Sequence, residues 1–208
     1  MAGILTKLSN TIIAGIVLLI VLFVVMGLTV GGGSFGSAWW QFLFRYLHIL
    51  SGVMWIGLLW YFNFVQIPNM GKIPDEQKPA IGKVIAPAAL FWFRWGAMAT
   101  IVTGLILAHL NGYLVEAIAI GFTDDGNSTA IGVGMWLGAI MWFNVWFIIW
   151  PNQKRALGIV DADADSKAKS ARTAMLFSRT NTLLSIPMLF CMVAQQHGGF
   201  VSLMSKAG

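Results

Sequence analysis

Charged side chains are scarce in this sequence. Asp, Glu, Lys and Arg together make up 10% of its 208 residues, whereas 58% of the residues are hydrophobic. The core of one soluble domain cannot bury so much apolar surface, so a lipid bilayer must take up the excess. The formal net charge of +5 does not indicate a nucleic-acid partner, because the basic residues lie mainly in short segments beside apolar runs. The composition therefore predicts an integral membrane protein.

Cysteine is nearly absent as well. Cys191 is the single cysteine, so the chain can form no intramolecular disulfide and contains no Cys-x-x-Cys-His motif for covalent heme attachment. The apolar runs contain no Asp or Glu, which disfavours proton-coupled transport, since such transporters use an intramembrane carboxylate. No internal repeat, soluble domain or long linker is apparent. Residues 1–208 are therefore predicted to form a single transmembrane helical domain.

Long apolar runs, in contrast, are abundant. A membrane-spanning helix needs roughly twenty predominantly apolar residues. The first run follows Lys7, as in a secretory signal. It is longer than the apolar part of such a signal and is therefore expected to be a retained membrane helix. The sequence predicts an all-α bundle of about five transmembrane helices, over residues 11–30, 38–66, 87–114, 131–150 and 176–204.

Basic residues are unevenly distributed among the connecting segments. Nine of the thirteen Lys and Arg residues lie in the N-terminal tail and in the segments 68–86 and 151–173. These segments fall on one side of the membrane if the helices alternate in direction. The positive-inside rule makes that side cytoplasmic, which predicts a cytoplasmic N-terminus and an extracytoplasmic C-terminus.

The sequence contains three histidines, and the predicted topology places all of them in the outer half of the membrane. His48, His109 and His197 lie on three different predicted helices. An ionisable residue inside a span is energetically costly, so it usually faces the bundle interior and either pairs or does chemistry. Neutral imidazole is a frequent ligand of metals and heme iron. A histidine that only hydrogen-bonds a neighbouring helix is the alternative interpretation for each position.

Residues around His48 favour a noncovalently bound heme b. His48 and His109 could ligate the iron from two facing helices. Arg45 lies one turn outward from His48 on roughly the same face, where its guanidinium could pair with a heme propionate. Gly52 lies one turn inward, where the absence of a side chain would let a flat macrocycle approach the backbone. The predicted cofactor-binding residues are therefore His48, His109, Arg45 and Gly52.

A family resemblance supports a redox interpretation. It is carried by Tyr46-Leu47-His48-Ile49-Leu50-Ser51-Gly52, Trp55-Ile56-Gly57 and Tyr61-Phe62-Asn63. These residues resemble the membrane domain of bacterial membrane-bound urate hydroxylases, and weaker similarity surrounds Trp142-Phe143-Asn144 and Trp150-Pro151-Asn152. Those enzymes fuse this domain to a cytochrome c domain that receives electrons. The resemblance implies a stand-alone relative in the bacterial inner (plasma) membrane that passes electrons to a redox partner protein or a quinone.

Two other functions remain open. Leu47-His48 followed by Trp55-Ile56-Gly57 also resembles copper-resistance membrane proteins, and His48, His109 and His197 could bind copper or another transition metal. Alternatively, the chain is a cofactor-free accessory subunit of a larger membrane complex or a homo-oligomer, in which Gly134 and Gly138 permit close helix contact. Enzymatic activity and substrate are left undecided.

Overall fold

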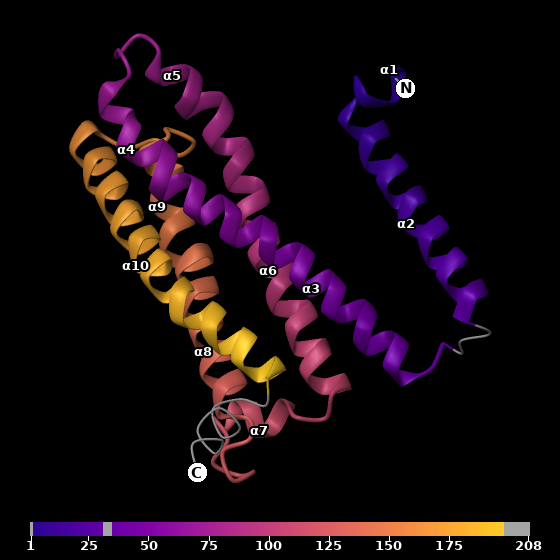
Figure 1. Ribbon diagram of the computed structural model, residues 1–208. Helices are drawn as coiled ribbons and strands as arrows, with labels where there is room; N and C mark the ends of the chain where they lie inside the picture. The colour runs from indigo at the N-terminus through magenta and orange to yellow at the C-terminus, as the bar shows by residue number, and fades with distance from the viewer. Residues whose placement is uncertain (1, 31–34, 198–208) are drawn as a thin grey trace. The chain divides into compact units, whose positions relative to one another are not determined.

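Five long helices make up most of the computed structural model, which describes residues 2–30 and 35–197 (Figure 1). Each helix is long and apolar enough to cross a membrane, which confirms the predicted all-α class with five candidate spans. The described ranges contain no β-strand. The candidate spans are Leu8–Thr29, Ser37–Lys72, Lys78–Leu110, Thr129–Ala156 and Ala164–Gln196.

The first two helices belong to a compact unit that ends at Trp40, and a second unit begins at Gln41. In the first unit, α1 (Ala2–Leu5) is followed by α2 (Leu8–Val30). From Ile12 to Leu28 every residue of α2 is apolar. A helix that is apolar all round is typical of a membrane span.

The other four candidate spans each combine an α-helix with shorter helical turns. In chain order these elements are α3 (Ser37–Trp60), η1 (Tyr61–Gln66), α4 (Ile67–Asn69), η2 (Met70–Lys72), α5 (Lys78–Ala80), η3 (Ile81–Ile85), α6 (Ala86–Leu110), α7 (Leu114–Ile118), α8 (Thr129–Phe143), η4 (Asn144–Ile149), α9 (Trp150–Ala156) and α10 (Ala164–Gln196). The segments η1, η3 and η4 are π-helical, and η2 is a 3₁₀ turn.

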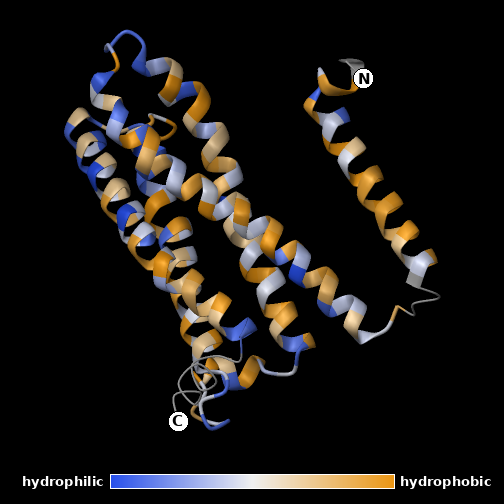
Figure 2. Cartoon of the chain, viewed as in Figure 1, coloured by the Kyte–Doolittle hydropathy of each residue, from blue (hydrophilic) through white to orange (hydrophobic). Residues whose placement is uncertain are grey.

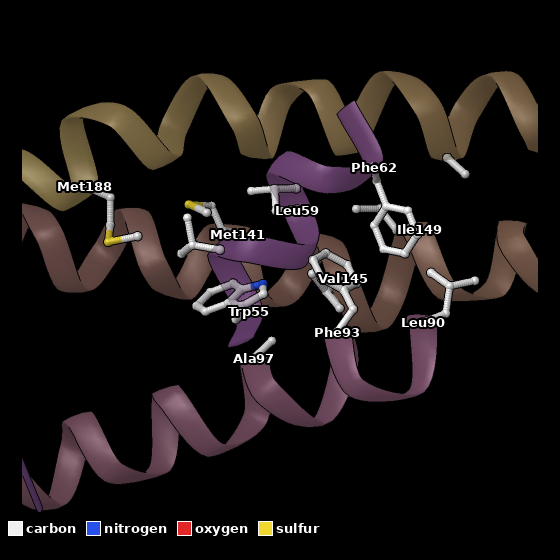
Figure 3. Packing of buried hydrophobic residues seen from close by; sticks show 12 residues of the cluster. Trp55, Leu59, Phe62, Leu90, Phe93, Ala97, Met141, Val145, Ile149 and Met188 are labelled. Atoms are coloured by element: carbon white, nitrogen blue, oxygen red, sulfur yellow. The ribbon is translucent and has the colours of Figure 1, made fainter. Parts of the chain in front are cut away.

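An apolar cluster from α3, α6, α8 and α10 forms the core of the second unit (Figure 3). Trp55, Leu59, Phe93 and Met141 are almost completely buried within it. The rings of Phe62 and Phe93 meet edge to face with their centroids 5.7 Å apart. Because lipid chains are as apolar as these side chains, the cluster stabilises a membrane bundle through close packing.

All three π-helical segments end two residues before a proline. The segments η1, η3 and η4 precede Pro68, Pro87 and Pro151, respectively. Proline cannot donate to the carbonyl four residues earlier, and its ring clashes with that carbonyl. A wider π turn relieves the clash without ending the helix. Each proline therefore widens a helical turn instead of ending the helix, and the span continues through it.

The spans that contain α3 and α8 repeat one another. The first contains Met54-Trp55-Ile56-Gly57, Phe62-Asn63 and Pro68-Asn69, and the second contains Met135-Trp136-Leu137-Gly138, Phe143-Asn144 and Pro151-Asn152. Both pass into a π-helical segment near the shared asparagine. We call residues 45–69 the first copy and residues 126–152 the second copy, with the shared residues beginning at Met54 and Met135. The expectation of no internal repeat is therefore wrong. The repeat is hard to see in the sequence because the identities are scattered and the second copy has two extra residues before its proline.

Several helix ends differ from the predicted spans: the helices extend to Lys72, start at Lys78 and extend to Ala156. Local backbone chemistry explains two further differences. The α6 helix ends at Leu110, before the predicted 114, since Gly112 adopts a φ of +77° that a helix cannot continue. The α10 helix begins at Ala164, well before the predicted 176. Asp163 caps it by accepting a hydrogen bond from the backbone N–H of Ser166 at 2.7 Å. The predicted end at 204 lies outside the described residues.

Candidate functional site

His48 is held between α3 and α6. Its Nδ1 atom lies 2.9 Å from the backbone carbonyl oxygen of Thr100. A carbonyl oxygen only accepts hydrogen bonds, so Nδ1 carries the proton and donates it. In the neutral ring, Nε2 then keeps its lone pair. Histidines that bind metal ions commonly have this arrangement. The ring nitrogen that does not bind the metal donates to a carbonyl oxygen, and this bond fixes the tautomer and the ring orientation.

Gly104 and Thr103 complete the seat of the imidazole on α6. A Cβ atom at Gly104 would lie 2.8 Å from Cε1 of His48 and 3.1 Å from its Nδ1. Only a glycine lets the ring approach this closely. The hydroxyl oxygen of Thr103 lies 3.4 Å from Nδ1 and donates to the carbonyl of Ala99 at 2.6 Å. The imidazole is therefore fixed by backbone and small side chains.

Arg45 lies one turn from His48 and carries an unpartnered nitrogen. Its Nε atom is buried and has no hydrogen-bond partner in the part of the chain that the structure describes. Burial raises the pKa of the Tyr113 hydroxyl, and the charge of Arg45 opposes that rise. Gly52 lies beside α6, since a Cβ there would meet the Thr100 side chain at 4.0 Å. This is ordinary contact and does not require glycine.

The structure does not bring His109 to His48. The helices α3 and α6 run antiparallel, because the side chain of Gln41 donates to the carbonyl of Leu110 at 2.8 Å while His48 bonds to Thr100. His109 is therefore level with the region of Gln41, about 10 Å along the axis from His48. The nine residues from Thr100 to His109 make 2.5 turns, so the two leave α6 on opposite sides. His109 is also exposed.

The three histidines do not form one group. His197 is the exposed C-cap residue of α10. Among residues 2–30 and 35–197, no set of three or more His, Cys, Asp or Glu side chains is placed to hold a metal ion. Nε2 of His48 and the guanidinium of Arg45 are the groups that could hold a cofactor such as heme from one side. His109 is not placed to add a second axial ligand.

The residues that orient His48 were missed by sequence reasoning. Thr100, Thr103 and Gly104 occupy one face of α6 within its apolar stretch from Gly96 to Ala108, at spacings of three and four residues. This spacing indicates that the three residues share a face of α6. That this face contacts His48 depends on the register of α3 against α6, which the sequence does not show.

A second polar network joins the core to α10 and is structural. The side-chain amide of Asn63 donates to the hydroxyl of Ser178 at 2.8 Å, and that of Asn144 donates to Asn181 Oδ1 at 2.8 Å. Asn181 in turn donates to the carbonyl of Met141 at 2.9 Å. Each copy is thus bonded to α10 through its shared asparagine, as membrane helices commonly are.

Comparison with known proteins gives one match. Residues 122–205 match the family model described as urate oxidase N-terminal. The match confirms the resemblance to urate hydroxylase membrane domains, and it covers the second copy and α10. No curated protein and no solved structure matches the chain.

Proposed function

We propose, from the match of residues 122–205 to the urate oxidase N-terminal family, that the chain is a membrane-embedded redox subunit that binds heme b. His48 would be an axial ligand of the iron, and Arg45 would bind a propionate. The bundle would have its N-terminus in the cytoplasm and lie in the bacterial inner membrane. This family supplies the redox setting of the proposal, and the residues around His48 supply the cofactor.

The observation that carries the proposal is the hydrogen bond from Nδ1 of His48 to the carbonyl of Thr100. It fixes the tautomer and leaves Nε2 as a ligand without any change of protonation. The glycine seat at Gly104 holds the ring in one orientation. A fixed imidazole loses little conformational entropy on ligation, which favours tight binding.

Arg45 supplies the second contact. A guanidinium without a partner is costly in a membrane span, and a carboxylate of the cofactor would remove that cost with a charge-assisted hydrogen bond. A bound heme supplies reversible one-electron transfer, with a potential that depends on its axial ligand and its burial. His48 would therefore bind and orient the iron, and Arg45 would orient the macrocycle.

Absorption spectroscopy of the purified full chain from heme-replete cells tests the proposal. The wild type should show a Soret band and a reducible α band, and pyridine hemochrome analysis should identify heme b. H48A should lose most of the heme, whereas H109A and H197A should retain it because neither residue lies at the His48 seat. A colourless, metal-free wild type would overturn the proposal in favour of an accessory subunit. Stoichiometric copper without heme would overturn it in favour of metal handling.

A further inference from the structure

Arg94, Trp150 and Lys154 form a cluster of two cations around one aromatic ring. The guanidinium carbon of Arg94 lies 3.3 Å from the centroid of the Trp150 ring. The ammonium nitrogen of Lys154 lies 5.7 Å from the same centroid. Trp146 adds a second ring 5.7 Å from the guanidinium. The indole of Trp150 attracts both cations, so both lie within 5.7 Å of its ring centroid.

This cluster contains no anion from the described chain. The only salt bridge in residues 2–30 and 35–197 joins Lys78 to Asp75, so neither Arg94 nor Lys154 is ion-paired. Arg94 donates from Nε to the carbonyl of Leu90 at 3.1 Å, which leaves its terminal N–H groups available. Both cations near Trp150 therefore have charge left to attract an anion.

Trp150 and Lys154 lie in α9, near the end of the bundle where hydrophilic residues gather around α4, α5 and the start of α10 (Figure 1 and Figure 2). Arg94 lies within the candidate span Lys78–Leu110 and reaches back toward this end through its bond to Leu90. Trp150 starts α9, after the last π-helical turn of its span. Tryptophan beside a long basic side chain is typical of the headgroup depth of a membrane.

Apolar surface flanks the cluster on α6. Phe91, Trp92 and Trp95 are 47%, 56% and 49% exposed, respectively, and they belong to the same helix turns as Arg94. A ligand that binds here therefore meets cations at one end and exposed aromatic surface beside them. This combination matches an anionic phospholipid, which has a phosphate headgroup attached to apolar chains, better than it matches a free ion.

We propose that Arg94 and Lys154, aligned on Trp150, bind the phosphate of an anionic phospholipid. The proposal is independent of the heme, because the cluster shares no residue with the His48 site. Trp150 would preorganise the two cations, and the guanidinium would donate to the phosphate oxygens.

Native mass spectrometry of the full chain in mild detergent, titrated with phosphatidylglycerol or phosphatidylcholine, tests this proposal. We expect the wild type to bind phosphatidylglycerol at least about tenfold more tightly than phosphatidylcholine. R94Q/K154Q should lose that preference. K83Q, which removes one exposed charge outside the cluster, should keep it. Equal binding of the two lipids by the wild type, or an unchanged preference in R94Q/K154Q, would overturn the proposal.

Two further measurements keep the test decisive. If R94Q/K154Q does not fold, K154Q alone should lower the affinity for phosphatidylglycerol about fivefold, and an unchanged affinity would contradict the proposal. Millimolar inorganic phosphate should leave bound phosphatidylglycerol in place. Displacement by inorganic phosphate would show that the site takes free phosphate, which would overturn the assignment to a lipid.

Discussion

The two copies of the repeated span share the residues of their second part and differ in the residues before it. Each contains the same spaced tryptophan, glycine, phenylalanine and asparagine, and each passes through a π-helical turn to a Pro-Asn pair. At the positions equivalent to Arg45 and His48, however, the second copy has Gly126 and Thr129. The repeated residues are therefore those that build the helices and bond them to α10, whereas the residues proposed for chemistry occur once.

The family match sharpens this contrast. It covers residues 122–205, which include the second copy and exclude His48. The match therefore includes one of the two copies of the scaffold, together with α10. The proposed cofactor site is a feature of the first copy, and it stands on the geometry of His48, Thr100 and Gly104.

Removal of His48 should give the largest difference between the copies. We expect H48A to lose most of the bound heme, because no other described histidine lies at the seat on α6. The equivalent change in the second copy, T129A, should leave the heme content unchanged. Heme per protein, measured by pyridine hemochrome with a protein assay, gives the comparison. Equal heme contents in H48A and T129A would break the proposed asymmetry.

Substitution of Gly104 should have a smaller effect on the same site. A Cβ atom there would lie 2.8 Å from the imidazole of His48, so G104A should push the ring from its seat and lower heme occupancy several-fold. Gly138 of the second copy is a matched control, since a Cβ there meets no atom within 4 Å. The heme content and melting temperature of G138A should equal those of the wild type. A fully occupied G104A protein would show that the imidazole does not need this seat.

The sequence predicted the membrane class and five candidate spans, because length and hydropathy alone determine whether a helix can cross a bilayer. It also singled out His48 and Arg45. It could not place His109, because the side of α6 that faces α3 depends on the register between Gln41 and Leu110. The repeat was missed because identities such as Trp55 with Trp136 are few and scattered. The α10 start was misplaced because residues 164–175 are polar and form a helix beyond the apolar run.

The shared asparagines should contribute similarly to stability. N63A removes the bond to Ser178, and N144A removes the bond to Asn181. Hydrogen bonds between membrane helices contribute about 0.6 kcal/mol on average, so each variant should be destabilised by about that amount. Unfolding of the detergent-solubilised protein in a graded denaturant series measures both. T180A, on the exposed face of α10, serves as the control. A loss confined to one asparagine would show that the two copies are not equivalent in bonding α10.

The smallest effect on stability is expected in the polar connections that follow each copy. Each connection contains an acidic residue, and the two residues have different hydrogen-bond partners. After the first copy, Asp75 pairs with Lys78, which lowers the pKa of that carboxyl. After the second, the backbone N–H of Ser166 lowers the pKa of Asp163, the N-cap of α10. A lowered folded-state pKa stabilises the protein above the unfolded value of about 3.9, and the contribution is lost as the pH falls through the folded value.

At pH 7, therefore, D163A should melt about 2 °C below the wild type, and the difference should narrow as the pH falls below the unfolded value of about 3.9. Thermal melts across that pH range measure it. D163N keeps a good N-cap without the charge, so its melting temperature should not follow this pH dependence. The two connections should also respond differently to salt. The Asp75 pair is exposed, so about 1 M salt should screen its contribution to stability. The hydrogen bond of Asp163 to a backbone N–H is local, so its contribution should persist. A salt-sensitive difference between D163A and the wild type would mean that Asp163 acts through a distant charge, and the distinction between the two connections would fail.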